Sequence, residues 1–321
     1  MTASERRYLV TGGAGFIGSH IVEGLLGRGE QIVILDDFST GRRENFESAL
    51  RSRPAAAPDP EMIEGDIRDV AAVLKAMRGV THVLHQAALP SVQRSVEDPV
   101  SSHEVNATGT LNLLVAARDA GVLRFVYASS SSAYGDSPAL PKVETMTPAP
   151  LSPYAVSKLT GEYYCRIFHS LYGLETVSLR YFNVFGPRQD PNSQYAAVIP
   201  NFIAAAISGK PPTIHGDGLQ SRDFTYIENA VEANLKACEA PSSAAGRAFN
   251  IACGTKTTLL DVIRVLEGAM GKSIRPIHGP PRQGDVKNSL ADIGEARQYL
   301  GYEPRIDLEE GLRRTLAWFA R

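Results

Sequence analysis

Cysteine, net charge and long apolar runs are all scarce in this chain of 321 residues. Its three cysteines, Cys165, Cys238 and Cys253, lie far apart and in no CxxC arrangement, which argues against a disulfide framework or a zinc site. Such cysteine usage fits a reducing compartment, so we expect a cytoplasmic protein. The formal net charge is only −2 and the basic residues are scattered, so we expect no nucleic-acid partner.

Metal-ligand spacings and membrane segments are also missing from the sequence. The seven histidines follow no ligand pattern such as HExxH, so we expect no metal. The chain runs from a few polar residues straight into "YLVTGGAGFIG", and no apolar run reaches the length of a membrane span. We therefore expect neither a signal peptide nor a membrane partner. A hydrophobic content of 43% and a charged content of 21% are typical of a globular enzyme.

Strand-like runs alternate with helical patterns along the first half of the chain. The runs are "YLVT", "QIVILD", "THVLHQA", "RFVYASS" and "TVSLRYF", and the helical patterns between them include "FIGSHIVEGLLGRG" and "VNATGTLNLLVAARDAG". This β-α alternation predicts an α/β fold with a doubly wound parallel sheet of the Rossmann type, covered by helices on both faces.

The amino-acid composition of the chain changes after Phe182. Turn-rich segments such as "SGKPPTIHGDGLQSRDF" predict a smaller α/β lobe, whereas "FTYIENAVEANLKACEA" is helical and "AFNIAC" is a candidate strand returning to the sheet. We therefore expect a discontinuous division. One domain would contain residues 1–182 plus about 224–256, and the smaller lobe would contain residues 183–223 plus 257–321.

A glycine-rich turn follows the first predicted strand and opens a predicted helix. "TGGAGFIG" spaces Gly12, Gly15 and Gly18 as GxxGxxG, which permits a tight turn, close approach of a pyrophosphate and packing of helix on sheet. The helix N-terminus offers free N–H groups to the phosphates. Asp36, which ends the second predicted strand, can accept from both ribose hydroxyls and would repel a 2′-phosphate. The pattern predicts a site for NAD rather than NADP.

The segment "SPYAVSK" carries a candidate acid–base pair. Ser152 is a good helix N-cap and Pro153 suits the first helical position, so Tyr154 and Lys158 should share one helix face. A free tyrosine has a pKa of about 10, and a neighbouring ammonium group should lower it. YxxxK is common by chance, and an ordinary amphipathic helix is the alternative interpretation.

Taken with their surroundings, these motifs identify a family resemblance that covers nearly the whole chain. The motifs are "TGGAGFIGSH", "HQAALPSVQRS", "YASSSSAYGD", "LSPYAVSKL", "RYFNVFGPRQDPNSQYAAVIP", "GDGLQSRDFTYI" and "RQGDVKNSLAD". The chain resembles the extended short-chain dehydrogenase/reductases, and within them the nucleotide-sugar 4-epimerases that act on UDP-N-acetylglucosamine and UDP-glucose. The resemblance implies NAD-dependent inversion at C4 of a UDP-hexose through a 4-keto intermediate.

The resemblance implies three catalytic residues. Tyr154 would exchange the proton of the sugar 4-hydroxyl, Lys158 would hold the nicotinamide ribose, and Ser130 would hydrogen-bond the same sugar oxygen. It also implies a cofactor site, with Asp66 and Ile67 near the adenine. The expected cofactor residues are Gly12, Gly15, Phe16, Ile17, Gly18, Asp36, Asp37, Ser39, Thr40, Gly41, Asp66, Ile67, Gln86, Ala87, Ala88, Tyr154 and Lys158.

The UDP-sugar site is assigned by the same resemblance. Arginines bind the diphosphate, because a guanidinium fork matches phosphate geometry. A small residue at position 289 leaves room for an N-acetyl group, where a tyrosine would restrict the pocket to glucose and galactose. The expected substrate residues are Ser131, Ser132 and Arg94 near the sugar, Asn183, Arg222 and Arg282 at the diphosphate, Asp285 at the uridine ribose, Val198 at the uracil and Ser289 at the sugar C2 group.

Alternative activities within the same fold are weighed at a few positions. Sugar-nucleotide dehydratases carry an Asp-Glu pair where this chain has Ser131 and Ser132, which argues against dehydration. Glucuronate-specific epimerases carry a Thr and an Arg that bind the carboxylate where this chain has Asn183 and Asp190. Asp190 would repel that carboxylate, which disfavours a uronic acid, although Arg94 nearby keeps such a substrate open. A sugar-nucleotide decarboxylase is a further alternative with the same fold. A regulator that only senses NAD would be expected to lose the Tyr-Lys pair or the phosphate arginines.

Two further expectations concern the sugar pocket and assembly. Pro90 stands where close relatives often carry glycine, which leaves the fine sugar preference open. The helices at residues 105–121 and 154–173 resemble the pair that forms a four-helix dimer interface in this family, so we expect a homodimer. Simple core packing is the alternative for both helices.

Overall fold

The fold centres on one parallel sheet, which confirms the predicted doubly wound architecture. The computed structural model describes residues 6–191, 197–280 and 287–320. Its seven-stranded sheet has the order β11-β6-β5-β4-β1-β2-β3, and every neighbouring pair is parallel. The strands are β1 Arg7–Thr11, β2 Gln31–Asp36, β3 Glu61–Glu64, β4 His82–His85, β5 Arg124–Ser130, β6 Glu175–Tyr181 and β11 Arg247–Ile251.

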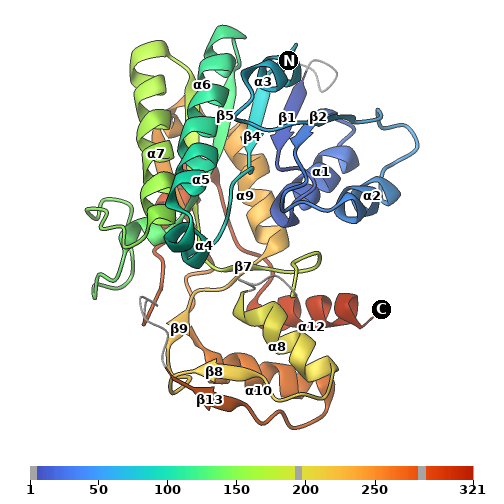
Figure 1. Ribbon diagram of the computed structural model, residues 1–321, viewed down its shortest axis with the longest axis vertical. Helices are drawn as coiled ribbons and strands as arrows, with labels where there is room; N and C mark the ends of the chain where they lie inside the picture. The colour runs from blue at the N-terminus through green and yellow to red at the C-terminus, as the bar shows by residue number, and fades with distance from the viewer. Residues whose placement is uncertain (1–5, 192–196, 281–286, 321) are drawn as a thin grey trace.

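Helices cover both faces of this sheet, because consecutive strand residues point to opposite sides. Tyr8 and Val10 belong to one apolar core, whereas Leu9 and Val33 belong to the other. Figure 1 shows α6 and α7 packed side by side over one face and α1 on the other. The first core is closed by α1 Phe16–Gly27, α2 Arg43–Arg51, α9 Ile227–Glu239 and α11 Gly294–Leu300. The second is closed by α3 Val70–Ala76, α6 Thr110–Asp119 and α7 Pro153–Tyr172, with α4 Val92–Glu97 and α5 Pro99–His103 beside α7.

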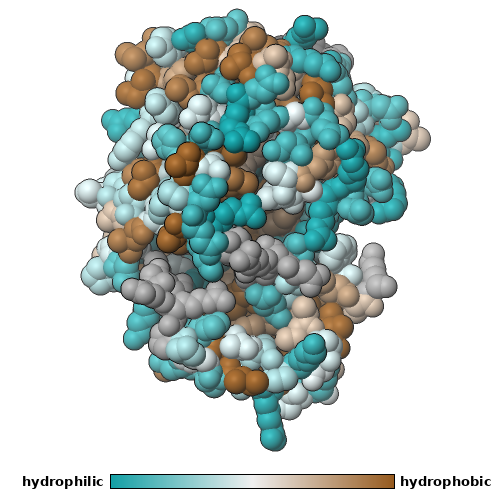
Figure 2. Space-filling view, in the orientation of Figure 1, coloured by the Kyte–Doolittle hydropathy of each residue, from teal (hydrophilic) through white to brown (hydrophobic). Residues whose placement is uncertain are grey.

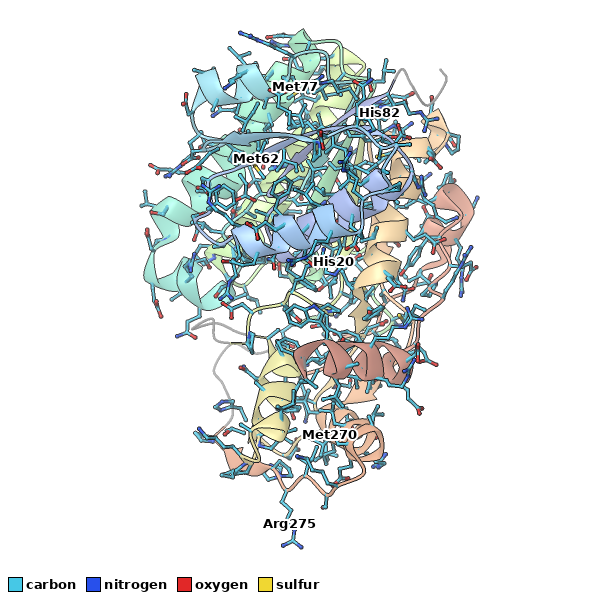
Figure 3. The ribbon with its side chains drawn as sticks, turned by 90° about the vertical axis from the view of Figure 1, so that its right-hand side faces the viewer. His20, Met62, Met77, His82, Met270 and Arg275 are labelled. Atoms are coloured by element: carbon cyan, nitrogen blue, oxygen red, sulfur yellow. The ribbon has the colours of Figure 1, made fainter. Side chains whose placement is uncertain are left out.

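A smaller lobe with its own apolar core lies at one end of the sheet (Figure 1). Figure 3 shows α1, which carries His20, across the large domain, and Met270 in the lobe below it. The lobe contains α8 Val198–Ile207, α10 Leu259–Met270 and α12 Leu308–Phe319. Its short strands pair as β7 Val184–Phe185 with β10 Thr225–Tyr226, β8 Thr213–His215 with β13 Ile277–Gly279, and β9 Ser221–Arg222 with β12 Thr257–Thr258.

Two predicted helices differ from the simple pattern. The helix expected over residues 105–121 begins with a π-helical turn, Glu104–Gly109, before α6 starts. This wider turn carries Asn106, whose side chain hydrogen-bonds both the backbone N–H and the carbonyl of Leu89, at 2.8 and 3.1 Å. The helix expected from residue 224 is preceded by β10, because Thr225 and Tyr226 pair with β7.

Within residues 6–191, 197–280 and 287–320, every helix is too short or too polar to span a membrane. These same segments contain no group of three or more His, Cys, Asp or Glu residues arranged to hold a metal ion.

Candidate active site

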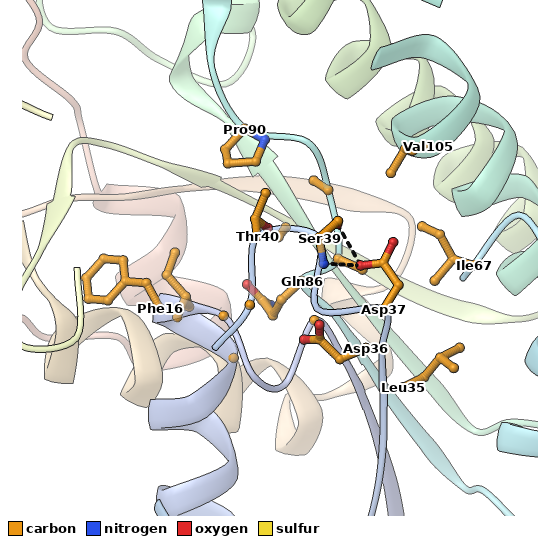
Figure 4. Close-up of a pocket in the computed structure, with 18 of the residues that line it drawn as sticks. Phe16, Leu35, Asp36, Asp37, Ser39, Thr40, Ile67, Gln86, Pro90 and Val105 are labelled. Carbon is orange, nitrogen blue, oxygen red and sulfur yellow. Dashed lines mark hydrogen bonds between the residues drawn. The ribbon is translucent and has the colours of Figure 1, made fainter. Parts of the chain in front are cut away.

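A pocket lies at the carboxyl ends of the central strands, beside the neighbouring strands β1 and β4. The chain continues from β1 toward one edge of the sheet and from β4 toward the other edge. Parallel sheets bind ligands at such a switch point. All the residues that the sequence predicted for the cofactor line this pocket (Figure 4). They come from the turn after β1, the end of β2, the segments after β3 and β4, and α7.

The glycine turn after β1 leaves backbone exposed where a side chain would not fit. Gly12 has a φ of +68°, and a Cβ there would lie 2.7 Å from the backbone nitrogen of Ala87. A Cβ on Gly18 would lie 2.0 Å from the carbonyl oxygen of Gly12. The N-cap of α1, Gly15, provides no side-chain acceptor, so the first N–H groups of the helix stay available for an anion. This cradle fits the pyrophosphate of a dinucleotide.

Asp36 is held at the end of β2 by two backbone donors. Its Oδ2 accepts from the N–H of Ala14 at 2.8 Å, and its Oδ1 accepts from the N–H of Phe38 at 2.9 Å. Burial raises the pKa of this carboxyl group above its ordinary value. Each carboxylate oxygen has a second lone pair, which leaves acceptors for ribose hydroxyls. In the same loop Asp37 accepts from the N–H and hydroxyl of Ser39 at 2.9 and 2.6 Å (Figure 4).

Tyr154 and Lys158 reach the pocket from the first turns of α7. The predicted cap is confirmed, because the Ser152 hydroxyl accepts from the N–H of Ala155 at 3.1 Å. Ser130, at the end of β5, is a hydrogen-bonding neighbour of the Tyr154 hydroxyl. The Lys158 ammonium group donates to the carbonyl of Ala128 at 2.8 Å. Strand β5 and helix α7 thus bring the three predicted catalytic residues together.

The ionisation of Tyr154 differs from the prediction. Burial raises its pKa above the ordinary 10.0, and only the hydrogen bond from Ser130 opposes this shift. Burial also lowers the pKa of Lys158 to about 8, so its ammonium group is mainly charged at pH 7. The expected lowering of the tyrosine pKa by Lys158 was therefore wrong for the protein alone, because desolvation is the larger effect.

The serine run after β5 forms a tight 3₁₀ turn, Ser131–Tyr134. The N–H of Ser132 donates to the Ser130 hydroxyl at 3.2 Å, which fixes the turn to the catalytic strand. The Ser132 hydroxyl is buried and finds no hydrogen-bond partner among the described residues. An unpaired buried hydroxyl is costly, and a polar ligand group would satisfy it.

Three of the predicted substrate residues come together in the lobe. The Asn183 amide lies 3.4 Å from the Ser289 hydroxyl, and the N–H of Ser289 donates to the carbonyl of Ser221 at 3.0 Å. The guanidinium group of Arg222 donates to the carbonyls of Ser221 and Lys287 at 2.9 and 3.2 Å. Val198 begins α8. Arg282 and Asp285 lie outside the described residues.

Arg94 is placed apart from this cluster. It lines a second hollow together with Asp37, Ser39, Arg68 and Asp98, on the side of the cofactor pocket. Helix α4 carries it toward the β2–α2 loop, and its assignment to the sugar stays a prediction.

Comparison with known proteins identifies the family. Residues 8–252 match the model of the NAD dependent epimerase/dehydratase family. The chain belongs to this family. It is 39% identical to the UDP-glucose 4-epimerase of Mycolicibacterium smegmatis over 98% of both chains. It is 35% identical to the UDP-glucuronate 4-epimerase of Thermodesulfobacterium geofontis, over 97% of this chain and 95% of that one.

Solved structures of epimerases share the fold over nearly the full length. The UDP-N-acetylglucosamine 4-epimerase of Methanobrevibacter ruminantium, solved with UDP-N-acetylmuramic acid, superposes with a TM-score of 0.92 at 38% identity over 98% of both chains. The UDP-glucose 4-epimerase of Thermus thermophilus, solved with NAD, gives 0.86 at 40% identity over 98% of both chains. The cofactor of this epimerase/dehydratase family member is thus NAD, and the glycine cradle and Asp36 have the geometry that such a dinucleotide requires.

Some pocket residues of this family member were missed from the sequence. They are Leu35, Gly65, Val105, Ala128, Ser129 and Tyr181. Ala128, Ser129 and Tyr181 lie at or near the ends of β5 and β6, so the rule that ligands bind at strand ends would have found them. Gly65 directly follows β3 and falls under the same rule, whereas Val105 carries no comparable signal.

The carboxylate of Asp190, which would repel a uronic acid, lies beside a cation in the structure. Its carboxylate pairs with the guanidinium group of Arg42, from the β2–α2 loop, at 2.5 Å. A paired carboxylate repels a second carboxylate less than a free one does, so repulsion by Asp190 no longer weighs strongly against a uronate substrate.

A buried ion pair lies directly behind the catalytic residues. Glu162, one helical turn after Lys158, accepts from two nitrogens of Arg180 at 2.9 and 2.7 Å, and both side chains are only 6% exposed. Ser129, next to Ser130, also donates to Glu162. Arg180 further donates to the Tyr134 hydroxyl at 2.8 Å. This network ties β5, β6 and α7 together at the level of the pocket.

Breaking this pair should destabilise the protein strongly. Arg180→Met leaves the Glu162 charge buried and unpaired, so we expect a loss of about 3–5 kcal/mol in the free energy of unfolding. The double variant Glu162→Leu/Arg180→Met removes both charges and should lose less. Urea unfolding measures both, with Arg313→Met at the exposed Glu310 pair as the control, where a change below about 1 kcal/mol is expected. A single variant as stable as the double one would contradict the assignment.

Proposed function

We propose that this chain is an NAD-dependent 4-epimerase of UDP-hexoses. The observation that carries the proposal is that Tyr154 and Lys158 line the pocket formed by the dinucleotide turn, with the Ser130 hydroxyl hydrogen-bonded to Tyr154. A base, its hydrogen-bonding partner and a cation at one site are the groups needed to remove and return a hydroxyl proton. The similar proteins named above act on C4 of UDP-sugars, which supports the same reaction here.

In the proposed reaction, Tyr154 takes the proton of the sugar 4-hydroxyl as C4 is oxidised to a ketone. Bound NAD would supply the acceptor for the C4 hydride and the donor that returns it to the opposite face of the ketone. Tyr154 then returns its proton to the new 4-hydroxyl, with the Ser130 hydroxyl holding the same oxygen. Lys158, whose ammonium group lines the same pocket, would hold the nicotinamide ribose.

The uridine diphosphate is proposed to bind the Asn183–Arg222–Ser289 cluster, together with Arg282, Asp285 and Val198. The large domain, residues 1–182 plus about 224–256, would then bind the cofactor, and residues 183–223 plus 257–321 would bind the UDP-sugar. The hydroxymethyl group of Ser289 favours N-acetylated hexoses, with the non-acetylated pair accepted as well. A uronic acid substrate is the second candidate, because Arg42 already pairs with Asp190.

A homodimer is proposed from an exposed apolar surface on α7. Val156, Tyr163, Ile167 and Leu171 on α7 are 46–68% exposed and recur at helical spacing, so they form one apolar stripe. Figure 2 shows hydrophobic side chains gathered along the side where α6 and α7 lie in Figure 1. A second copy would cover this stripe, and the molar mass in solution tests this.

A location in the cytoplasm is proposed because the free cysteines fit a reducing compartment.

The activity is tested by incubating purified protein with UDP-N-acetylglucosamine, UDP-glucose and UDP-glucuronate in turn, without added NAD. We expect chromatography to resolve the C4 epimer of the first two sugars at equilibrium. A 4-keto-6-deoxy product would indicate a dehydratase, loss of carbon dioxide would indicate a decarboxylase, and no product from any of these sugars would contradict the proposal.

Asp36→Ala should weaken NAD binding and relax the preference over NADP. The variant loses a charged acceptor for the ribose hydroxyls, worth about 1.5–3 kcal/mol, so we expect NAD affinity to fall at least about tenfold. Nucleotide released by denaturation identifies the bound species, and titration gives both affinities. Glu64→Ala, an exposed carboxylate at the end of β3, is the control and should change neither. NADP as the species bound to the wild type would overturn the assignment.

A further inference from the structure

Asp223 is a buried carboxylate that the proposed reaction does not use. It follows Arg222 directly after β9, and its side chain is fully buried. Its Oδ1 accepts from the N–H of Cys253 at 2.9 Å, and its Oδ2 accepts from the N–H groups of Gly254 and Ala291 at 3.0 and 3.2 Å. The N–H of Thr255 is a further donor. One side chain thus gathers two separate backbone segments around itself.

Each of these segments leads to a different part of the site. Cys253 and Gly254 follow β11, the edge strand of the large sheet. Ala291 lies two residues after Ser289. The backbone carbonyl of Asp223 also accepts from the Asn183 side chain at 2.9 Å, and Asn183 itself has the unusual φ of +38°. Asp223 therefore joins the large sheet to the parts of the chain that carry Asn183 and Ser289.

We propose that Asp223 is a positioning residue that holds Asn183, Arg222 and Ser289 in the arrangement that binds the uridine diphosphate. This inference rests on the proposed function, because it deepens the description of that same substrate site. None of the three residues is fixed by the regular hydrogen bonds of the large sheet or of a long helix. Their relative placement depends on contacts between short segments. Asp223 accepts a hydrogen bond from Asn183, directly follows Arg222, and accepts from Ala291, two residues after Ser289.

The chemistry of a carboxylate suits this position. An ionised carboxylate offers about four acceptor positions and no donor, which matches the backbone N–H groups around it. Burial raises the pKa of Asp223 to about 6, so the group is mainly ionised at pH 7.5. The nearby Cys253 thiol is neutral at that pH, because burial raises its pKa to about 12. The backbone donors, and not a cation, oppose the effect of burial on Asp223.

Asp223→Asn tests this role with little change in shape. The amide keeps one acceptor oxygen but turns an NH₂ group toward backbone donors, so at least one buried N–H loses its partner. At pH 7.5 we expect the dissociation constant for UDP, measured by calorimetry, to rise on the order of tenfold. NAD content and kcat at saturating UDP-sugar should stay within a few-fold of the wild type, so the loss should appear in KM.

A matched control separates positioning from general weakening of the lobe. Asp261→Asn removes the carboxylate of the capping box at the start of α10, in the same lobe but outside the site. It should lower the melting temperature without changing UDP affinity. Equal UDP affinity of Asp223→Asn and the wild type, or the same loss of affinity in both variants, would overturn the inference. A wild type that binds no UDP would instead overturn the proposed function.

Hydrogen exchange of the wild type gives a second measurement that needs no variant. The amides of Cys253, Gly254 and Ala291 share one acceptor group, so UDP binding should slow their exchange together. UDP-independent exchange of these amides in a protein that does bind UDP would contradict the positioning role, even if Asp223→Asn fails to fold.

Discussion

Tyr154→Phe should lower kcat for UDP-hexose epimerisation by on the order of 10²–10⁴, the range for a lost acid–base group. The substitution removes only the hydroxyl that hydrogen-bonds Ser130 and keeps the ring that lines the pocket. Folding and NAD retention should therefore be nearly unchanged. Initial rates with UDP-glucose, together with the nucleotide content of the denatured variant, measure both effects.

The control for this variant is Tyr163→Phe on the same helix. Tyr163 is 51% exposed, so loss of its hydroxyl should leave the rate unchanged. Turnover of Tyr154→Phe within a few-fold of the wild type would remove Tyr154 from the proposed proton transfer.

Ser289→Tyr should convert an enzyme for acetylated and plain hexoses into one for plain hexoses. The Ser289 hydroxyl lies 3.4 Å from the Asn183 amide, and its backbone is fixed to Ser221. A tyrosine ring on this fixed backbone would occupy the space assigned to the acetamido group. Overpacking of about 1–3 kcal/mol corresponds to a loss of up to about 100-fold in kcat/KM for UDP-N-acetylglucosamine, with UDP-glucose conversion retained.

Selectivity is read as the ratio of kcat/KM for the two sugars in one preparation, which cancels differences in active fraction. Ser289→Ala keeps the space and should keep the ratio. A tyrosine variant with an unchanged ratio would contradict the assignment of Ser289 to the C2 group. A wild type that does not convert acetylated sugars would also contradict it. Narrowing of the sugar pocket by Pro90, which lines the neighbouring cofactor pocket, would then be the explanation to test.

The parts of the site that sequence alone predicted are those encoded by local pattern. The glycine spacing after β1, Asp36 at the end of β2, and the Ser152 cap that orients Tyr154 and Lys158 each depend on a few consecutive residues. The sheet followed from the β-α alternation for the same reason. Local sequence determines these features because turns, caps and strand ends are built from neighbouring residues.

The features that were missed depend on residues distant in sequence. The Glu162–Arg180 pair and the backbone donors around Asp223 are visible only when separate elements pack together. The π-helical turn near Asn106 likewise follows from tertiary contacts, because the Asn106 side chain hydrogen-bonds the backbone of Leu89. The pKa of Tyr154 was predicted with the wrong sign, because the extent of burial cannot be read from a YxxxK spacing.

The central claim is that the hydrogen on C4 leaves and returns within one active site. The most direct measurement uses UDP-glucose carrying deuterium at C4, incubated with the purified enzyme in ordinary water without added NAD. We predict that mass spectrometry and NMR find the C4 epimer with its deuterium retained at C4. An epimer that has exchanged this deuterium for solvent hydrogen would contradict the account.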